Sequence, residues 1–148
     1  MKLCRLPPAS LLARFKLINF RKMSLFFGQD KPEDDNIREL CVVLNDLIKD
    51  HRWLVFLKGT PEQPRCGFSQ GICQILAHEK ISFDWVDMSK DAQLLVALKA
   101  YSKFPTLPQL WVDQKFIGGF DVTKTLWKTG ELKKMWQETI EDQNKKSK

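Results

Sequence analysis

One cysteine stands where a reactive thiol can be activated. Cys66 follows the loop TPEQPRC and precedes Gly67, where helical periodicity begins. A helix N-terminus carries about half a unit of positive charge and free N–H groups, which favour the thiolate, the form that attacks disulfides and binds metals. Lys58, at the end of the preceding predicted strand, would bring a full positive charge near this sulfur. The alternative is that Cys66 is a buried small hydrophobic residue, and its neighbours Pro64, Arg65 and Gly67 argue against this.

Ser69 stands where the second cysteine of a CxxC pair would be. In such a pair the second thiol releases the first from a mixed disulfide, and serine cannot do this. Cys66 can therefore form a mixed disulfide or ligate a metal, but it cannot close a local disulfide. Cys73 would lie about 10 Å along the same helix, which is beyond disulfide reach. We expect Cys73 and Cys41 to be core residues, and a resolving role for Cys73 is the alternative.

Two further segments have ligand-binding chemistry. In FPTLPQ, residues 104–109, Pro108 is a candidate for a cis peptide bond, since such bonds are almost confined to X–Pro. A cis turn would leave the backbone of Leu107 free to pair with an extended peptide. In GGFD, residues 118–121, the glycines allow close approach, and a helix start capped by Asp121 favours a carboxylate. The alternatives are an edge-strand start and a simple hairpin-to-helix turn.

The elements that position these residues alternate along the chain. Apolar periodicity predicts a helix over 36–51, capped by Asp34, Asp35 or Asn36, a buried strand over 53–59 and a helix from Gly67. A strand over 81–88 and a helix over 91–102 follow. Strands over 108–113 and 115–119 are joined by a two-residue hairpin turn, and helices over 121–129 and 130–142 end the domain. This α/β order predicts a thioredoxin-like fold, with a four-stranded mixed sheet flanked by helices.

The first 29 residues differ in charge from the rest of the chain. They hold six basic and no acidic residues, whereas the remainder holds 18 of each, so the net charge of +6 belongs to this segment. Its composition indicates a mitochondrial transit peptide ending between Met23 and Lys31. A disordered basic tail and translation from Met23 are the alternatives. This balanced remainder, which contains the domain over residues 30–142, does not indicate nucleic-acid binding, and no apolar run is long enough for a membrane span. Residues 143–148 are expected to form a disordered tail.

The three motifs together resemble the monothiol glutaredoxins of the CGFS type. KGTPEQPRCGFS, FPTLPQ and GGFD occur in order within residues 35–142, and the similarity is greatest to single-domain mitochondrial members. The resemblance implies a thioredoxin-like fold, glutathione binding and a [2Fe-2S] cluster shared by a homodimer. It also implies cluster transfer in the mitochondrial matrix, with iron–sulfur scaffold proteins, recipient apoproteins and BolA-like proteins as partners.

The resemblance also implies a role for each site residue. Cys66 would be the reactive thiol and the iron ligand, and two glutathione thiolates and the partner's cysteine would complete the four ligands. Lys58 would pair with a glutathione carboxylate and help to activate Cys66. The backbone of Thr106 and Leu107, ahead of Pro108, would bind the cysteine part of glutathione. Its γ-glutamyl end would be held by the turn at Gly119, Phe120 and Asp121.

Three residues depart from the family pattern. Phe104 replaces a frequent tryptophan, and Phe120 replaces a frequent cysteine, which removes another disulfide partner for Cys66. Leu95 stands where related chains have an arginine that binds the glycine carboxylate of glutathione, and Lys99, one turn later, is the candidate replacement. The sequence favours an iron–sulfur carrier. A glutathione-dependent thiol oxidoreductase and an adaptor with an inactive site are the alternatives, and Lys58 and the intact TLP turn count against the adaptor.

Overall fold

The computed structural model describes residues 33–146. Helix α2 (Glu33–Asp50) leads into strand β1 (Trp53–Leu57), helix α3 (Gly67–His78), strand β2 (Asp84–Asp87) and helix α4 (Ala92–Ser102). Strands β3 (Gln109–Val112) and β4 (Lys115–Gly118) form a hairpin, and helices α5 (Phe120–Thr129) and α6 (Glu131–Lys146) follow. The predicted leader, residues 1–29, lies outside the described residues.

A four-stranded mixed sheet forms the centre, in the order β2-β1-β3-β4. β1 pairs in parallel with β2 and antiparallel with β3, and β3 pairs antiparallel with β4. All five residues of β1 are buried, as expected of an apolar central strand covered on both faces. The predicted thioredoxin-like fold is therefore confirmed.

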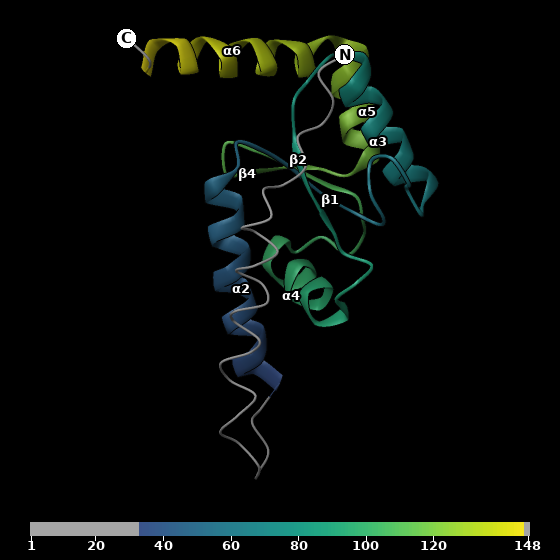
Figure 1. Cartoon of the computed structure of the whole chain (residues 1–148), viewed down its shortest axis with the longest axis vertical. Coiled ribbons are helices and arrows are strands. Elements are labelled where there is room, and N and C mark those ends of the chain that lie inside the picture. Colours follow the sequence, from purple (N-terminus) through teal and green to yellow (C-terminus); the bar gives the residue numbers. More distant parts are fainter. Residues whose placement is uncertain (1–32, 147–148) are drawn as a thin grey trace.

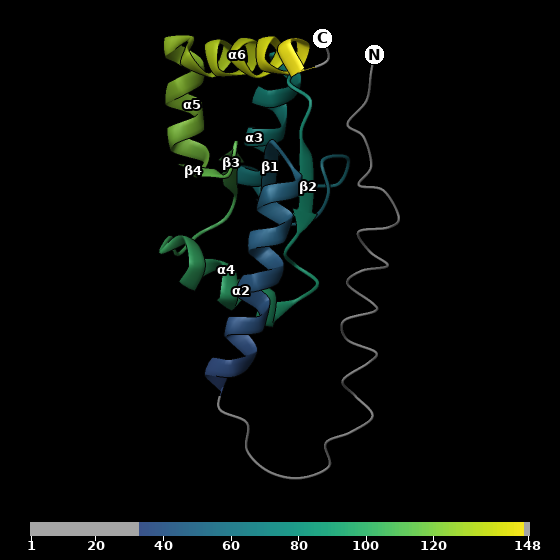
Figure 2. The same ribbon diagram turned by 90° about the vertical axis from the view of Figure 1, so that its left-hand side faces the viewer.

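Alternate residues of β1 reach two separate cores. Trp53, Val55 and Leu57 pack on the side of α3, α5 and α6, while Leu54 and Phe56 pack on the side of α2 and α4. This alternation follows from the period of two in a strand. Figures 1 and 2 show α2 beside α4 on one side of the sheet, α3 and α5 on the other, and α6 across one end. No helix within residues 33–146 is long and apolar enough to cross a membrane.

Several predicted boundaries were wrong. α2 begins at Glu33, ahead of its three candidate caps. β2 begins only at Asp84, because Ile81 donates its backbone N–H to Leu76 and so still belongs to the turn that ends α3. α6 continues to Lys146, so residues 143–146 are helical where a disordered tail was predicted.

The cap of α5 was also placed wrongly. Gly119, not Asp121, is the N-cap, because the N–H and the hydroxyl of Thr123 both donate to the Gly119 carbonyl. Asp121 lies inside the first turn, where its negative charge still faces the positive end of the helix dipole.

Candidate functional site

The loop between β1 and α3 folds back on itself and delivers Cys66 to the start of α3. Arg65 donates its backbone N–H to the Lys58 carbonyl at 2.9 Å, and Gly59 pairs with Pro64 in an isolated bridge. Gly59 has φ of +90°, a region that glycine tolerates best, and a Cβ there would lie 2.8 Å from the backbone nitrogen of Arg65. The loop is therefore closely packed, and its shape depends on Gly59.

Asp87 fastens this loop to the end of β2. Its carboxylate accepts hydrogen bonds from the Gly59 N–H at 2.9 Å and from both the N–H and the hydroxyl of Ser89. Burial acts to raise the pKa of Asp87, but the Ser89 and Gly59 hydrogen bonds and the charge of Lys90 outweigh it, and the pKa is lowered. Asp87 therefore remains an anion at neutral pH and holds the base of the loop.

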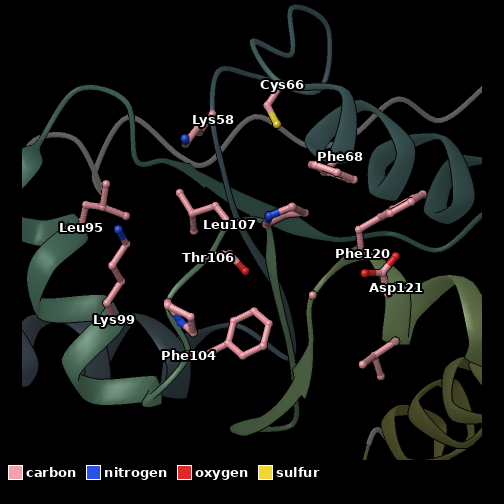
Figure 3. Close-up of a pocket in the computed structure, with 14 residues that line it drawn as sticks. Lys58, Cys66, Phe68, Leu95, Lys99, Phe104, Thr106, Leu107, Phe120 and Asp121 are labelled. Carbon is pink, nitrogen blue, oxygen red and sulfur yellow. The ribbon is translucent and has the colours of Figure 1, made fainter.

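Cys66 is the N-cap residue of α3, in extended conformation with φ −145° and ψ 136°. Its carbonyl accepts the Gln70 N–H at 2.9 Å, while its side chain makes no capping hydrogen bond. The half-buried thiol points into the cavity that Lys58 also enters (Figure 3). The predicted position of this thiol at a helix N-terminus is confirmed.

Ser69 has a structural role that sequence reasoning missed. It is fully buried, and its hydroxyl accepts the backbone N–H of Lys58 at 3.2 Å. This bond ties the first turn of α3 to the end of β1. Only the lack of a thiol at this position was visible in the sequence, because the partner atom belongs to another element.

A cavity of about 650 Å³ opens beneath Cys66. Every predicted site residue lines it, from the loop after β1, from the turn before β3 and from the start of α5, and so do Leu95 and Lys99 of α4. Figure 3 shows Lys58 and Lys99 on one side and Asp121 on the other, with Thr106 and Leu107 between them. The roles assigned to these residues remain predictions. The lining residues that sequence reasoning missed are Phe68, Pro105 and Val122.

The turn before β3 forms the floor of the cavity. The Leu107–Pro108 peptide bond, the candidate named from the sequence, is cis. Pairing of β3 with β1 begins at Gln109, so Leu107 lies outside the sheet ladder. Phe104 packs against Phe116 with ring centroids 5.2 Å apart, which fixes the start of the turn against β4.

Phe120 forms an aromatic wall with Phe68. Their ring centroids are 5.8 Å apart, and Lys124 lies 5.7 Å above the Phe120 ring. The ring rests directly on Gly71 of α3, where a Cβ would lie 2.9 Å from Cζ of Phe120. Gly71 therefore makes room for the Phe120 ring. Phe68 is 58% exposed beside the thiol, which leaves an apolar surface open at the mouth of the cavity.

The other two described cysteines lie away from the cavity. Cys73 is 7% exposed and belongs to the core between the sheet and α3. Cys41 is half-buried between α2 and α4, with its sulfur 4.0 Å from the Ala97 carbonyl. The prediction of a core position is confirmed for Cys73, whereas Cys41 is only partly buried at the edge of the core beside α2 and α4. Within residues 33–146, Cys66 is the cysteine that reaches the cavity.

Comparisons with known proteins place this chain in a family. The glutaredoxin family model matches residues 54–117. A chloroplastic monothiol glutaredoxin-S7 of rice is 40% identical over 103 residues, which cover 70% of this chain and 59% of the relative. A ycf64-like monothiol glutaredoxin of Synechocystis is 39% identical over 92 residues, which cover 62% of this chain and 86% of the relative. The matched region thus spans less than two thirds of the length of the rice protein.

Solved structures share the fold. The solution structure of reduced poplar apo GrxS14 is 38% identical, covers 68% of this chain and 93% of its own, and gives a TM-score of 0.60. A buckwheat glutaredoxin–glutathione complex, 18% identical, covers 72% and 96% with a TM-score of 0.64 and shows the shared fold alone. With one cysteine in its CGFS motif, the chain belongs to the glutaredoxin family and is a monothiol glutaredoxin.

Proposed function

We propose that this monothiol glutaredoxin binds glutathione beneath Cys66 and, as a dimer, carries a [2Fe-2S] cluster to recipient proteins. The observation that carries the proposal is the position of Cys66. It is the one thiol, among the described residues, at the mouth of a cavity whose charges match those of glutathione.

Glutathione is an extended tripeptide with a carboxylate at each end and an ammonium group beside one of them. Lys58 and Lys99 lie where they can pair with the glycine carboxylate. The N-terminus of α5 offers N–H groups to the γ-glutamyl carboxylate, and Asp121 supplies a negative charge for the ammonium. The Leu107 backbone lies between these ends. Leu95 supplies no charge, so Lys99 takes over the role of the missing arginine.

The cluster is the cargo of the protein, and a single subunit cannot hold it. A [2Fe-2S] cluster takes four ligands, usually thiolates. Within residues 33–146 no group of three His, Cys, Asp or Glu side chains could hold a metal, and Cys66 alone of the described cysteines reaches the cavity. A second subunit and two glutathiones supply the remaining three ligands. The exposed Phe68 gives the second subunit an apolar surface to cover.

The cellular setting follows from the leader. Residues 1–29, which are basic and acid-free, support import into the mitochondrial matrix. There the protein accepts clusters from an iron–sulfur scaffold and passes them to apoproteins, with BolA-like proteins as further partners.

Anaerobic reconstitution with iron, sulfide and glutathione tests the proposal. The protein should acquire the visible absorption of a [2Fe-2S] cluster and become a dimer with two glutathiones, and chelation should dissociate it. Cys66→Ser should bind no cluster, whereas the matched controls Cys73→Ser and Cys41→Ser should keep it. A cluster retained by Cys66→Ser, or one held by a monomer without glutathione, would overturn the proposal.

Deglutathionylation is the second candidate function, since the same half-buried thiol is open to the cavity mouth. The Cys66 thiolate would attack the glutathione sulfur of a mixed disulfide and expel the protein thiolate. A second glutathione thiolate would then attack the Cys66–glutathione disulfide, release oxidised glutathione and restore Cys66. Turnover of a glutathionylated peptide that fails to depend on Cys66 would exclude this function.

A further inference from the structure

A fully buried amide lies behind the floor of the cavity. Gln109, the first residue of β3, has no exposed surface and pairs with Phe56 in the sheet. Its Nε2 lies 3.0 Å from the Ser102 hydroxyl oxygen, 3.2 Å from the Phe104 carbonyl and 3.3 Å from the Thr106 carbonyl. One side chain therefore contacts three points along the segment that links α4 to β3.

The orientation of this amide is determined by its neighbours. The carbonyl oxygens of Phe104 and Thr106 can only accept hydrogen bonds, so the NH₂ group, and not Oε1, must face them. Oε1 is buried and has no hydrogen-bond partner among the described residues. Leaving a buried acceptor unpaired costs free energy. The fold bears this cost at Oε1 while the NH₂ group of the same amide holds the turn.

These contacts set the direction of a backbone donor in the cavity. The Thr106–Leu107 peptide bond is trans, since Leu107–Pro108 is the cis bond of the described chain. In a planar trans peptide the C=O and the following N–H point in opposite directions. Because Gln109 holds the Thr106 C=O toward the interior, the Leu107 N–H is turned away from Gln109. Both Thr106 and Leu107 line the cavity (Figure 3), so an N–H turned away from Gln109 can face it.

We propose that Gln109 is a positioning residue that aims the Leu107 N–H at the peptide backbone of a bound thiol tripeptide. It touches neither the ligand nor the reacting sulfur and acts through the Thr106–Leu107 peptide. The inference rests on the proposed binding of glutathione. Met has a similar length but no donor, and Glu has the same shape but, when ionised, places an anion against two carbonyl oxygens.

Glutathione titration of the cluster-free full chain, followed by NMR at the Leu107 amide, tests the inference. Gln109→Met should bind roughly tenfold more weakly, the effect of losing interactions worth about one hydrogen bond. Gln109→Glu should bind most weakly at pH 8 and recover toward pH 5.5, because a protonated carboxyl can again donate to a carbonyl. The parent protein should show no comparable recovery. A residue that only stabilises the fold would not produce this pH profile in affinity.

Thr139→Ala is the matched control for stability. Thr139 is buried in α6 and accepts a hydrogen bond from Trp53 at 3.1 Å, so its loss destabilises the fold without touching the cavity. Glutathione affinity should be unchanged in this variant under conditions where it is folded. Parent-like affinity in Gln109→Met would overturn the inference, as would an equal loss in Thr139→Ala. If the parent chain binds no glutathione, both the proposed function and this inference fail. If Gln109→Glu does not fold, the inference is tested by the glutathione affinity of Gln109→Met and of Ser102→Ala. The second variant removes one contact that Gln109 makes with the same turn.

Discussion

Gly59→Ala should disrupt the loop that carries Cys66. Gly59 has φ of +90°, where residues with a Cβ are strained. The added methyl group would overlap the carbonyl oxygen of Gln63 and lie 2.8 Å from the backbone nitrogen of Arg65. Both contacts are with backbone atoms, so the loop itself must move to relieve them.

The magnitude follows from these two effects. The unfavourable φ costs about 1–3 kcal/mol, and forcing an extra methyl into a packed site typically costs another 1–3 kcal/mol. We therefore expect the free energy of unfolding to fall by about 2–6 kcal/mol, a large part of the roughly 5–15 kcal/mol that stabilises a typical domain. Gly67→Ala is the control beside the same thiol. A Cβ at Gly67 meets nothing within 4 Å, so no loss of stability is expected.

Urea unfolding of the three proteins measures the stability difference, and alkylation of Cys66 under native conditions reports the position of the loop. Gly59→Ala should unfold at lower urea concentration and alkylate Cys66 at a different rate, while Gly67→Ala should follow the parent in stability. A Gly59→Ala protein within about 0.5 kcal/mol of the parent, the usual range for surface substitutions, would refute the argument that the loop depends on this glycine.

Three further predictions concern the site and its support. Ser69→Cys should restore a CxxC pair and raise turnover of a glutathionylated substrate. Ser69→Ala removes the acceptor of the Lys58 N–H and should lose about 1–3 kcal/mol of stability with no rise in turnover. Equal turnover in all three proteins would contradict this. Leu95→Arg should tighten glutathione and Lys99→Ala should weaken it, each roughly fivefold to tenfold, and identical titration curves would show that α4 does not contact glutathione. The hydrogen bond to Asp84, against the opposing effect of burial, raises the pKa of His51 above 6.5. The pair therefore adds stability that is complete below pH 6.5 and is lost as pH rises through the raised pKa; the stability gap between the parent and His51→Gln should narrow from pH 6 to pH 9, and a constant gap would refute the linkage.

Local patterns in the sequence were sufficient to predict the order of elements and the position of the reactive thiol. The apolar run after Arg52 predicted a buried strand, and β1 is buried along its whole length. The two-residue turn Asp113-Gln114 predicted a hairpin, and both residues have the positive φ that such turns require. Cys66 was placed at a helix start by the change from turn formers to helical periodicity. Each of these features depends on residues that are close together in the chain.

Features that depend on contacts between distant elements were visible only in the structure. Gly71 is an ordinary helical residue until the ring of Phe120 is placed on it. Ser69 was interpreted only as a missing thiol, because the N–H that it accepts belongs to the end of β1. The cap of α5 was placed at Asp121, since a carboxylate is a good cap, but the tertiary path of the chain places the N-cap two residues earlier, at Gly119.

The sequence by itself therefore determined the fold, the family and the thiol, because periodicity, turn chemistry and short motifs are local properties of the chain. The tertiary structure decided what surrounds that thiol. Lys58, Lys99, Leu107 and Asp121 come from four separate segments, and only the packing of α4, the turn before β3 and α5 around the end of β1 brings them to one cavity. Gln109 illustrates the same limit: one buried amide contacts three points along the segment before β3, and no spacing of residues in the chain reveals which way that amide points.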